Sequence, residues 1–269
     1  GVASAGLGLA ALVFRQMRLA LPVEETHDAP LAPSQRFWQV RDLSGQMSFT
    51  REAARSPAWD GRVAVQARGR VNEGPLEVSA EAGVAMEPGG SPEFELRDYA
   101  LSMQAGPLLV PTAQKAPLTV SSPRLPEPLR AVFEDYEPDG PVLLTASVRR
   151  GPDLGEPEIE AAAELLGVNG AYFRFPYEFE QTYGTVRFRG GQVLLENLRA
   201  RHGLARISGS GVLASTHQWT GFDLAFRATN VPLDAELYHA LPGEQQRLWA
   251  HVQPVGLADV WVSVSRPDA

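Results

Sequence analysis

The chain has 269 residues, of which 44% are hydrophobic and 21% charged, a balance typical of a folded protein. Its formal net charge of −8 argues against a nucleic-acid partner, because a phosphate backbone requires a basic surface. Cysteine is absent, which excludes a disulfide scaffold, a thiolate metal site and a cysteine nucleophile.

The amino-terminal residues form an uncharged run rich in Ala, Leu and Gly, which ends at Phe14 and is followed by Arg15 and Arg18. The run is shorter than the roughly 20 apolar residues that a membrane helix requires. We interpret residues 1–20 as part of a membrane anchor, with the apolar region of a signal peptide or an amphipathic helix on a soluble domain as alternatives. Residues 21–36 are rich in Pro, Glu and Ala without periodicity, which is typical of a linker.

From about residue 37 onwards, apolar residues recur at every second position, first between Leu76 and Met86 and later around Ile159, Phe173 and Phe222. This alternation predicts antiparallel strands with one face in water. Glycine-rich breaks separate the later runs at intervals typical of a meander. The sequence therefore predicts a mostly β protein with few helices.

One block occurs twice at a constant offset of 116 residues (254 − 138). Pro138-Asp-Gly140 precedes an alternating strand pattern that ends at Arg150, and Pro254-Val-Gly256 precedes one that ends at Arg266. Short helical segments are expected before each copy, at 129–136 in the first and at 234–238 and 243–249 in the second.

A weaker echo precedes each block, namely Gly45-Gln-Met47-Ser-Phe49 and Gly184-Thr-Val186-Arg-Phe188. The same order of blocks twice indicates a modular array in which neighbouring units share a core. We therefore predict a first β module at 37–150 and a second at 151–269.

Catalytic and metal-binding patterns are missing from the sequence. The five histidines are scattered without the spacing of a helical metal pair, and lone histidines of this kind are expected to be exposed or capped. Glu178 and Glu180 could form part of a glycosidase pair, but they fall on the polar parity that any wet strand face carries. We expect no enzyme activity, no catalytic residue, no metal and no cofactor.

The densest apolar feature is the aromatic cluster between Tyr172 and Phe179. Its side chains could form a closed core between two sheets, or they could form the wall of an open apolar groove. The alternation alone leaves both interpretations open.

The second half of the chain resembles the AsmA/TamB-like family over roughly residues 159–242, with a weaker echo in the first half. The resemblance rests on a series of motifs, namely Phe175-Pro-Tyr177, Tyr183-Gly-Thr-Val-Arg-Phe188, Gly191-Gln-Val-Leu-Leu-Glu-Asn-Leu198, Ile207-Ser-Gly-Ser-Gly211 and Val231-Pro-Leu-Asp234. In that family an aromatic-Pro strand is followed by two further strands and a glycine-centred turn.

The resemblance implies an extended antiparallel meander that curls into a half-open, groove-like sheet of repeated modules with a few short helices. It also implies a periplasmic location in a Gram-negative bacterium, with an inner-membrane anchor at the amino terminus. The expected function is to hold or conduct phospholipid acyl chains, in lipid transport between membranes or in outer-membrane assembly. The expected partners are a phospholipid, or another acyl-chain lipid, and the inner membrane.

The lipid-binding side chains that this interpretation predicts are the apolar members of the alternating strands. They are Val78, Ala80, Ile159, Ala163, Phe173, Phe175, Tyr177, Phe179, Val186, Phe188, Leu195, Phe222, Leu224 and Phe226. The alternative function is a structural or protein-binding β module of the cell envelope with an ordinary closed core.

Overall fold

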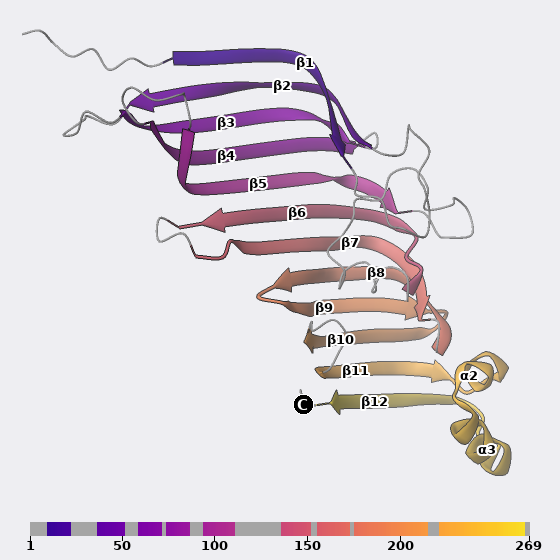
Figure 1. The fold of residues 1–269 in the computed structure, drawn as a ribbon. Helices are drawn as coiled ribbons and strands as arrows, with labels where there is room; N and C mark the ends of the chain where they lie inside the picture. The colour runs from indigo at the N-terminus through magenta and orange to yellow at the C-terminus, as the bar shows by residue number, and fades with distance from the viewer. Residues whose placement is uncertain are drawn as a thin grey trace, which may run out of the picture. The chain divides into compact units, whose positions relative to one another are not determined.

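The computed structural model describes residues 10–22, 37–51, 59–71, 74–86, 94–110, 136–151, 155–172, 175–214 and 221–266. Within these ranges the chain forms an antiparallel meander of twelve strands, hydrogen-bonded in sequence order from β1 to β12, with two short helices (Figure 1). The predicted mostly β meander with few helices is confirmed.

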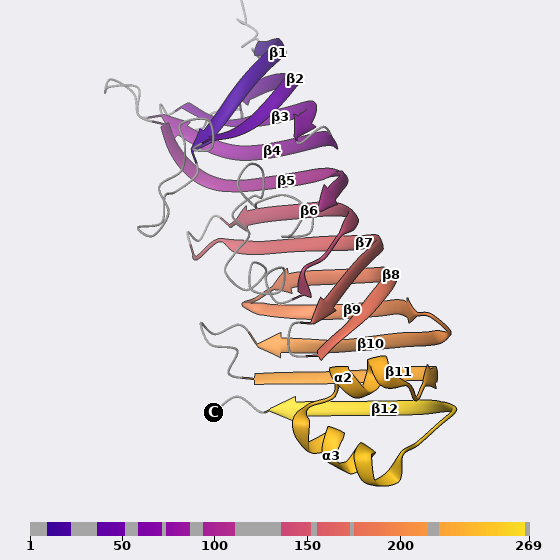
Figure 2. The same cartoon turned by 90° about the vertical axis from the view of Figure 1, so that its right-hand side faces the viewer.

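The elements have the following bounds: β1 (Ala10–Pro22), β2 (Phe37–Arg51), β3 (Trp59–Val71), β4 (Gly74–Met86), β5 (Phe94–Val110), β6 (Gly140–Arg150), β7 (Glu158–Tyr172), β8 (Phe175–Arg189), β9 (Gln192–His202), β10 (Ala205–Ala214), β11 (Gly221–Pro232), α2 (Ala235–Ala240), α3 (Gly243–Val252) and β12 (Leu257–Arg266). Both helices lie beside β11 and β12, as the turned view shows (Figure 2).

The contacts divide the chain into two compact units. Unit 1 comprises residues 1–106 and 145–161, and unit 2 comprises residues 107–144 and 162–269. The chain therefore passes from one unit to the other within β5, β6 and β7, whereas the predicted module boundary lies between residues 150 and 151, after β6. That module boundary stays a prediction.

The structure describes residues 10–20 of the expected anchor as strand rather than helix, and the anchor itself stays a prediction. Residues 10–20 belong to strand β1, which pairs with β2 so that Leu12 lies opposite Met47 and Leu19 lies opposite Val40. The run lacks the alternation that marks the other strands, so the sequence could not distinguish strand from helix here. No helix among the described ranges is long and apolar enough to cross a membrane. Residues 1–9, and residues 23–36 of the predicted linker, lie outside the described ranges.

The repeated block has positive φ values at the same two positions in both copies. Glu137 and Gln253, which are 116 residues apart, adopt left-handed φ values of 41° and 47°. Gly140 and Gly256, at the same offset, have φ values of 144° and 106°. A left-handed residue followed three positions later by a glycine with positive φ therefore introduces both β6 and β12, which supports the predicted repeat.

The weaker echo also has a structural counterpart, at an offset of 139 residues (184 − 45). Asp42 in β2 and Gln181 in β8 have left-handed φ values of 54° and 48°. In each strand the register with the following strand shifts at this residue, between Arg41 and Ser44 and between Glu180 and Tyr183. The same β-bulge thus lies three residues before the echoed glycine in both strands.

The predicted helical turns before β12 are confirmed as α2 and α3. Asp234 caps α2, because its carboxylate accepts a hydrogen bond from the Leu237 N–H at 3.0 Å. Of the corresponding segment before β6, only Tyr136 falls within the described residues, and it is helical.

Candidate functional site

The apolar side chains of β8 to β12 share one face, because the register places them opposite one another. Phe188 lies opposite Val193, Val193 opposite Leu213, and Leu213 opposite Phe222. In antiparallel sheets such directly paired residues point to the same side.

A second row of paired residues lies beside the first, and a third row begins on β10. The second consists of Val186, Leu195, Gly211, Leu224 and Val264, and the third of Gly209, Phe226 and Val262. We call the face that carries these three rows the unit 2 apolar face. Six predicted site residues meet there: Val186, Phe188, Leu195, Phe222, Leu224 and Phe226.

Two glycines on β10 leave space for side chains of β11 on this face. A Cβ on Gly209 would collide with the ring of Phe226, and one on Gly211 would collide with the side chain of Leu224. The motif Ser-Gly-Ser-Gly at 208–211 therefore leaves room for its neighbours on β11, and it lies in the middle of strand β10.

Exposure on the unit 2 apolar face increases towards β12. Val193 has no exposed surface and Val186 is 8% exposed, whereas Val262 and Val264 are 42% and 44% exposed. The aromatic side chains of Phe188, Phe222 and Phe226 are half-buried. A face sealed by a second layer would bury all of these side chains, so part of this face is accessible.

The aromatic residues of β8 extend the same face towards α2. Phe175, Tyr177 and Phe179 alternate with exposed Pro176, Glu178 and Glu180, and the aromatic members point to the side of Val186 beyond the bulge. Tyr177 is 3% exposed, and its ring lies 5.7 Å from the ring of Phe175. Phe173 lies outside the described residues.

Helix α2 covers the β8 end of this face through Tyr177 and His202. The two ring centroids are 3.7 Å apart, with the ring planes tilted by 31°, and His202 Nε2 lies 3.4 Å from a carboxylate oxygen of Glu236 on α2. His202 Nδ1 is 2.9 Å from the carbonyl oxygen of Glu178. Burial, and then the negative charges of Asp234 and Glu236, raise the pKa of Tyr177 to about 12.

This contact was not predicted, because His202 has no other histidine or metal-ligand pattern near it in the sequence. The side chain of His202 is only 12% exposed. Its position at the end of β9, opposite Ala205 and in line with the apolar parity of that strand, is the signal that could have placed it on the aromatic face.

Unit 1 has a separate apolar face with the same construction. Val78 lies opposite Ala67 and Met103, and Ala80 lies opposite Val65 and Leu101. Leu101 and Met103 are 40% and 37% exposed, so this face is accessible as well. The predicted residues Val78 and Ala80 are thus placed together with apolar neighbours that the prediction left out.

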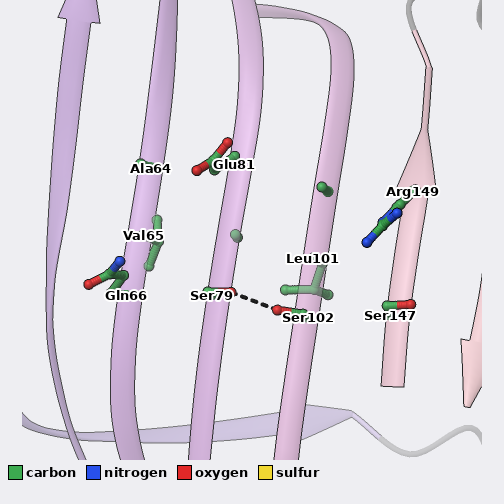
Figure 3. A pocket seen from close by; sticks show the side chains of 11 residues that line it. Ala64, Val65, Gln66, Ser79, Glu81, Leu101, Ser102, Ser147 and Arg149 are labelled. Atoms are coloured by element: carbon green, nitrogen blue, oxygen red, sulfur yellow. Dashed lines mark hydrogen bonds between the residues drawn. The ribbon is translucent and has the colours of Figure 1, made fainter. Parts of the chain in front are cut away.

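The opposite face of unit 1 is polar and slightly hollowed (Figure 3). Ser79 and Ser102 share a hydrogen bond of 2.6 Å there, with Gln66, Glu81 and Arg149 around them. The hollow holds about 210 Å³ and is open to solvent. We find no acid pair, nucleophile–base pair or carboxylate cluster in it.

The remaining predicted residues, Ile159 and Ala163, share a parity on β7. Ile159 is 45% exposed, whereas Ala163 is 5% exposed. The structure places them on one side of this strand.

Several residues that complete the two faces were not predicted as site residues, although they follow the same alternation. On the unit 2 apolar face they are Val193, Leu213, Val260, Val262 and Val264, and on unit 1 they are Met47, Val65, Leu101 and Met103.

In the described part of the chain, no group of three or more His, Asp or Glu side chains could hold a metal ion. Comparison with family models, with characterised proteins and with solved structures gives no match for this chain.

Proposed function

We propose that this chain is a non-enzymatic module that holds phospholipid acyl chains on its apolar sheet faces. One observation carries the proposal: the rows of apolar side chains across β8 to β12 are only partly buried, and their exposure rises to 44% at Val264. A face of this kind is unusual on a soluble protein unless it has an apolar ligand or partner.

The energetics favour an acyl chain over a polar ligand. Each buried CH₂ group contributes about 0.8 kcal/mol, so the burial of several CH₂ groups of an acyl chain gives useful affinity. A charged headgroup can stay in water above an accessible face, which avoids the large cost of burying an ion. The resemblance of residues 159–242 to the AsmA/TamB-like family points to the same ligand class and to a periplasmic, membrane-anchored location.

The test replaces two half-buried aromatic residues of the unit 2 apolar face with charge, in the variant Phe175→Asp/Phe188→Asp. Charge on this face opposes contact with acyl chains, so phospholipid that co-purifies with the full chain should fall at least fivefold. Lipid is extracted from protein purified without detergent and quantified by mass spectrometry. Circular dichroism checks that β content is kept.

The matched control is Thr185→Asp/Ser210→Asp, which places the same charges on the opposite face of β8 and β10. Its lipid content should equal that of the wild type. Equal lipid in both variants would contradict the proposal. Unfolding of only the aromatic variant would instead favour a closed core, because an unpaired buried charge strongly destabilises a core.

A further inference from the structure

The face of β9 to β11 that lies opposite the unit 2 apolar face carries four arginines. The register places Arg206 of β10 directly opposite Arg201 of β9. Ser208, two residues further along β10, lies opposite both Arg199 of β9 and Arg227 of β11. Directly paired residues, and residues two apart along a strand, point to the same side of a sheet. All five side chains are exposed, and we call them the basic patch.

The basic patch differs from the polar face of unit 1, where arginine is paired with carboxylate. Arg68 lies opposite Glu77, with its Nε 3.1 Å from a carboxylate oxygen. Within β9 to β11 the positions that face the four arginines carry Arg, Ser or Thr instead. Glu180 of β8 lies opposite Arg201, yet among the residues that the structure describes none of the four arginines forms an ion pair. Like charges directly opposite each other destabilise a sheet, and an anionic partner removes that repulsion.

Carboxylates and an aromatic ring border the basic patch. Glu180 on β8 and Asp223 on β11 are exposed on the same face. Trp261 of β12 lies opposite Arg227, whose guanidinium carbon is 4.7 Å from the centre of the indole ring. The side chain of Trp261 is 70% exposed. The arginines therefore form a small island of positive charge beside an exposed indole.

This arrangement favours the surface of a bilayer over a rigid polyanion. A nucleic acid presents its phosphates at a fixed spacing, so phosphates next to the bound ones would meet Glu180 and Asp223. Lipids move laterally, so anionic headgroups can gather at the arginines while zwitterionic headgroups lie at the carboxylates. Arginine binds phosphate through two parallel hydrogen bonds, and Trp is enriched at the interface between membrane and water.

We propose that the basic patch binds the anionic phospholipid headgroups of a bilayer surface. Arg199 and Arg227 flank Ser208, whose small side chain leaves space between them for a headgroup phosphate. Trp261 lies at the level of the headgroups. The inference goes beyond the proposed function and does not depend on it, because the patch and the apolar rows lie on opposite faces of the same strands.

The test measures how much of the full chain sediments with vesicles of phosphatidylcholine, with and without phosphatidylglycerol. We expect phosphatidylglycerol to increase the binding, and added salt to weaken it because salt screens surface charges. In Arg201→Gln/Arg206→Gln the affinity for the anionic vesicles should fall at least about tenfold, because each arginine near such a surface contributes separately. Both residues are exposed and of like charge, so the variant should fold, which circular dichroism checks.

The matched control is Arg62→Gln/Arg68→Gln, which changes the net charge equally but removes arginines that pair with Asp98 and Glu77. It should bind the anionic vesicles as the wild type does. Equal losses in both variants would overturn the proposal, since net charge alone would then govern binding. Binding that phosphatidylglycerol does not increase would also overturn it. Tighter binding to single-stranded DNA than to the vesicles would assign the patch to a nucleic acid and overturn it as well.

Discussion

At the scale of single residues, Tyr177 is the side chain whose chemistry the fold changes most. Its hydroxyl is buried and has no hydrogen-bond partner among the described residues. A buried hydroxyl without a partner costs about 1–3 kcal/mol, so the packing of its ring against His202 must compensate for it. Tyr177 therefore contributes to the fold through the packing of its ring under α2 and not through a hydrogen bond of its hydroxyl.

The raised pKa of Tyr177, about 12 against an ordinary 10, predicts a loss of stability at alkaline pH. The unfolded chain releases this proton near pH 10, whereas the folded chain keeps it until about pH 12. Unfolding is therefore accompanied by proton release, and the free energy of unfolding falls as pH rises from 10 to 12. Below pH 10 the contribution is fully present.

Urea unfolding between pH 9 and about pH 11 tests this on wild type and on Tyr177→Phe. The variant should lose less stability over this interval, because it has no phenol to titrate. Tyr183→Phe, which removes a phenol that is 51% exposed, serves as the control and should follow the wild type. If the free energy of unfolding falls equally with pH in the wild type and in Tyr177→Phe, the folded chain does not raise the pKa of Tyr177.

At the scale of strands, alternation predicted which residues share a face but not where the register changes. The bulges occur at non-glycine residues with positive φ, such as Asp42, Gln181, Asn197 and Asn230. Asn and Asp tolerate this conformation, but they are also ordinary residues of wet strand faces. Each bulge changes the parity of the apolar positions, so the correct face beyond it could not be read from alternation alone.

Gly184 tests whether the close approach of β8 to β9 after the bulge stabilises the pair of strands. The backbone of β9 leaves no space for a Cβ at this position. Its φ is +132°, and a Cβ would lie 2.9 Å from the carbonyl oxygens of Glu196 and Asn197. Gly184→Ala should therefore destabilise the chain by at least about 1–3 kcal/mol, the cost of such a conformation without any clash. Thermal and urea unfolding measure the change.

The matched control for that substitution is Gly190→Asn, in the turn between β8 and β9. Gly190 has a left-handed φ of +56° and open space around the position of a Cβ. Asn adopts this conformation readily, so the stability should change little. Comparable losses in both variants would mean that the close approach at Gly184 does not hold the two strands together.

At the scale of the whole molecule, the sequence predicted the antiparallel meander and the repeated blocks, because both follow from local patterns. It also predicted six residues of the unit 2 apolar face, among them Phe222, Leu224 and Phe226, which alternate without interruption. The sequence did not show that the unpatterned run at 10–20 forms strand β1, because the run lacks alternation. It also did not show that Tyr177 and His202 are in contact, because they lie on different strands.

The central claim is that partly buried apolar rows hold acyl chains. Native mass spectrometry of the full chain, expressed in a Gram-negative host and purified without detergent, tests this most directly. We predict additional species whose mass difference equals that of phospholipid and which disappear in Phe175→Asp/Phe188→Asp. A folded wild-type protein that carries no lipid under these conditions, even after incubation with phospholipid vesicles, would contradict the claim.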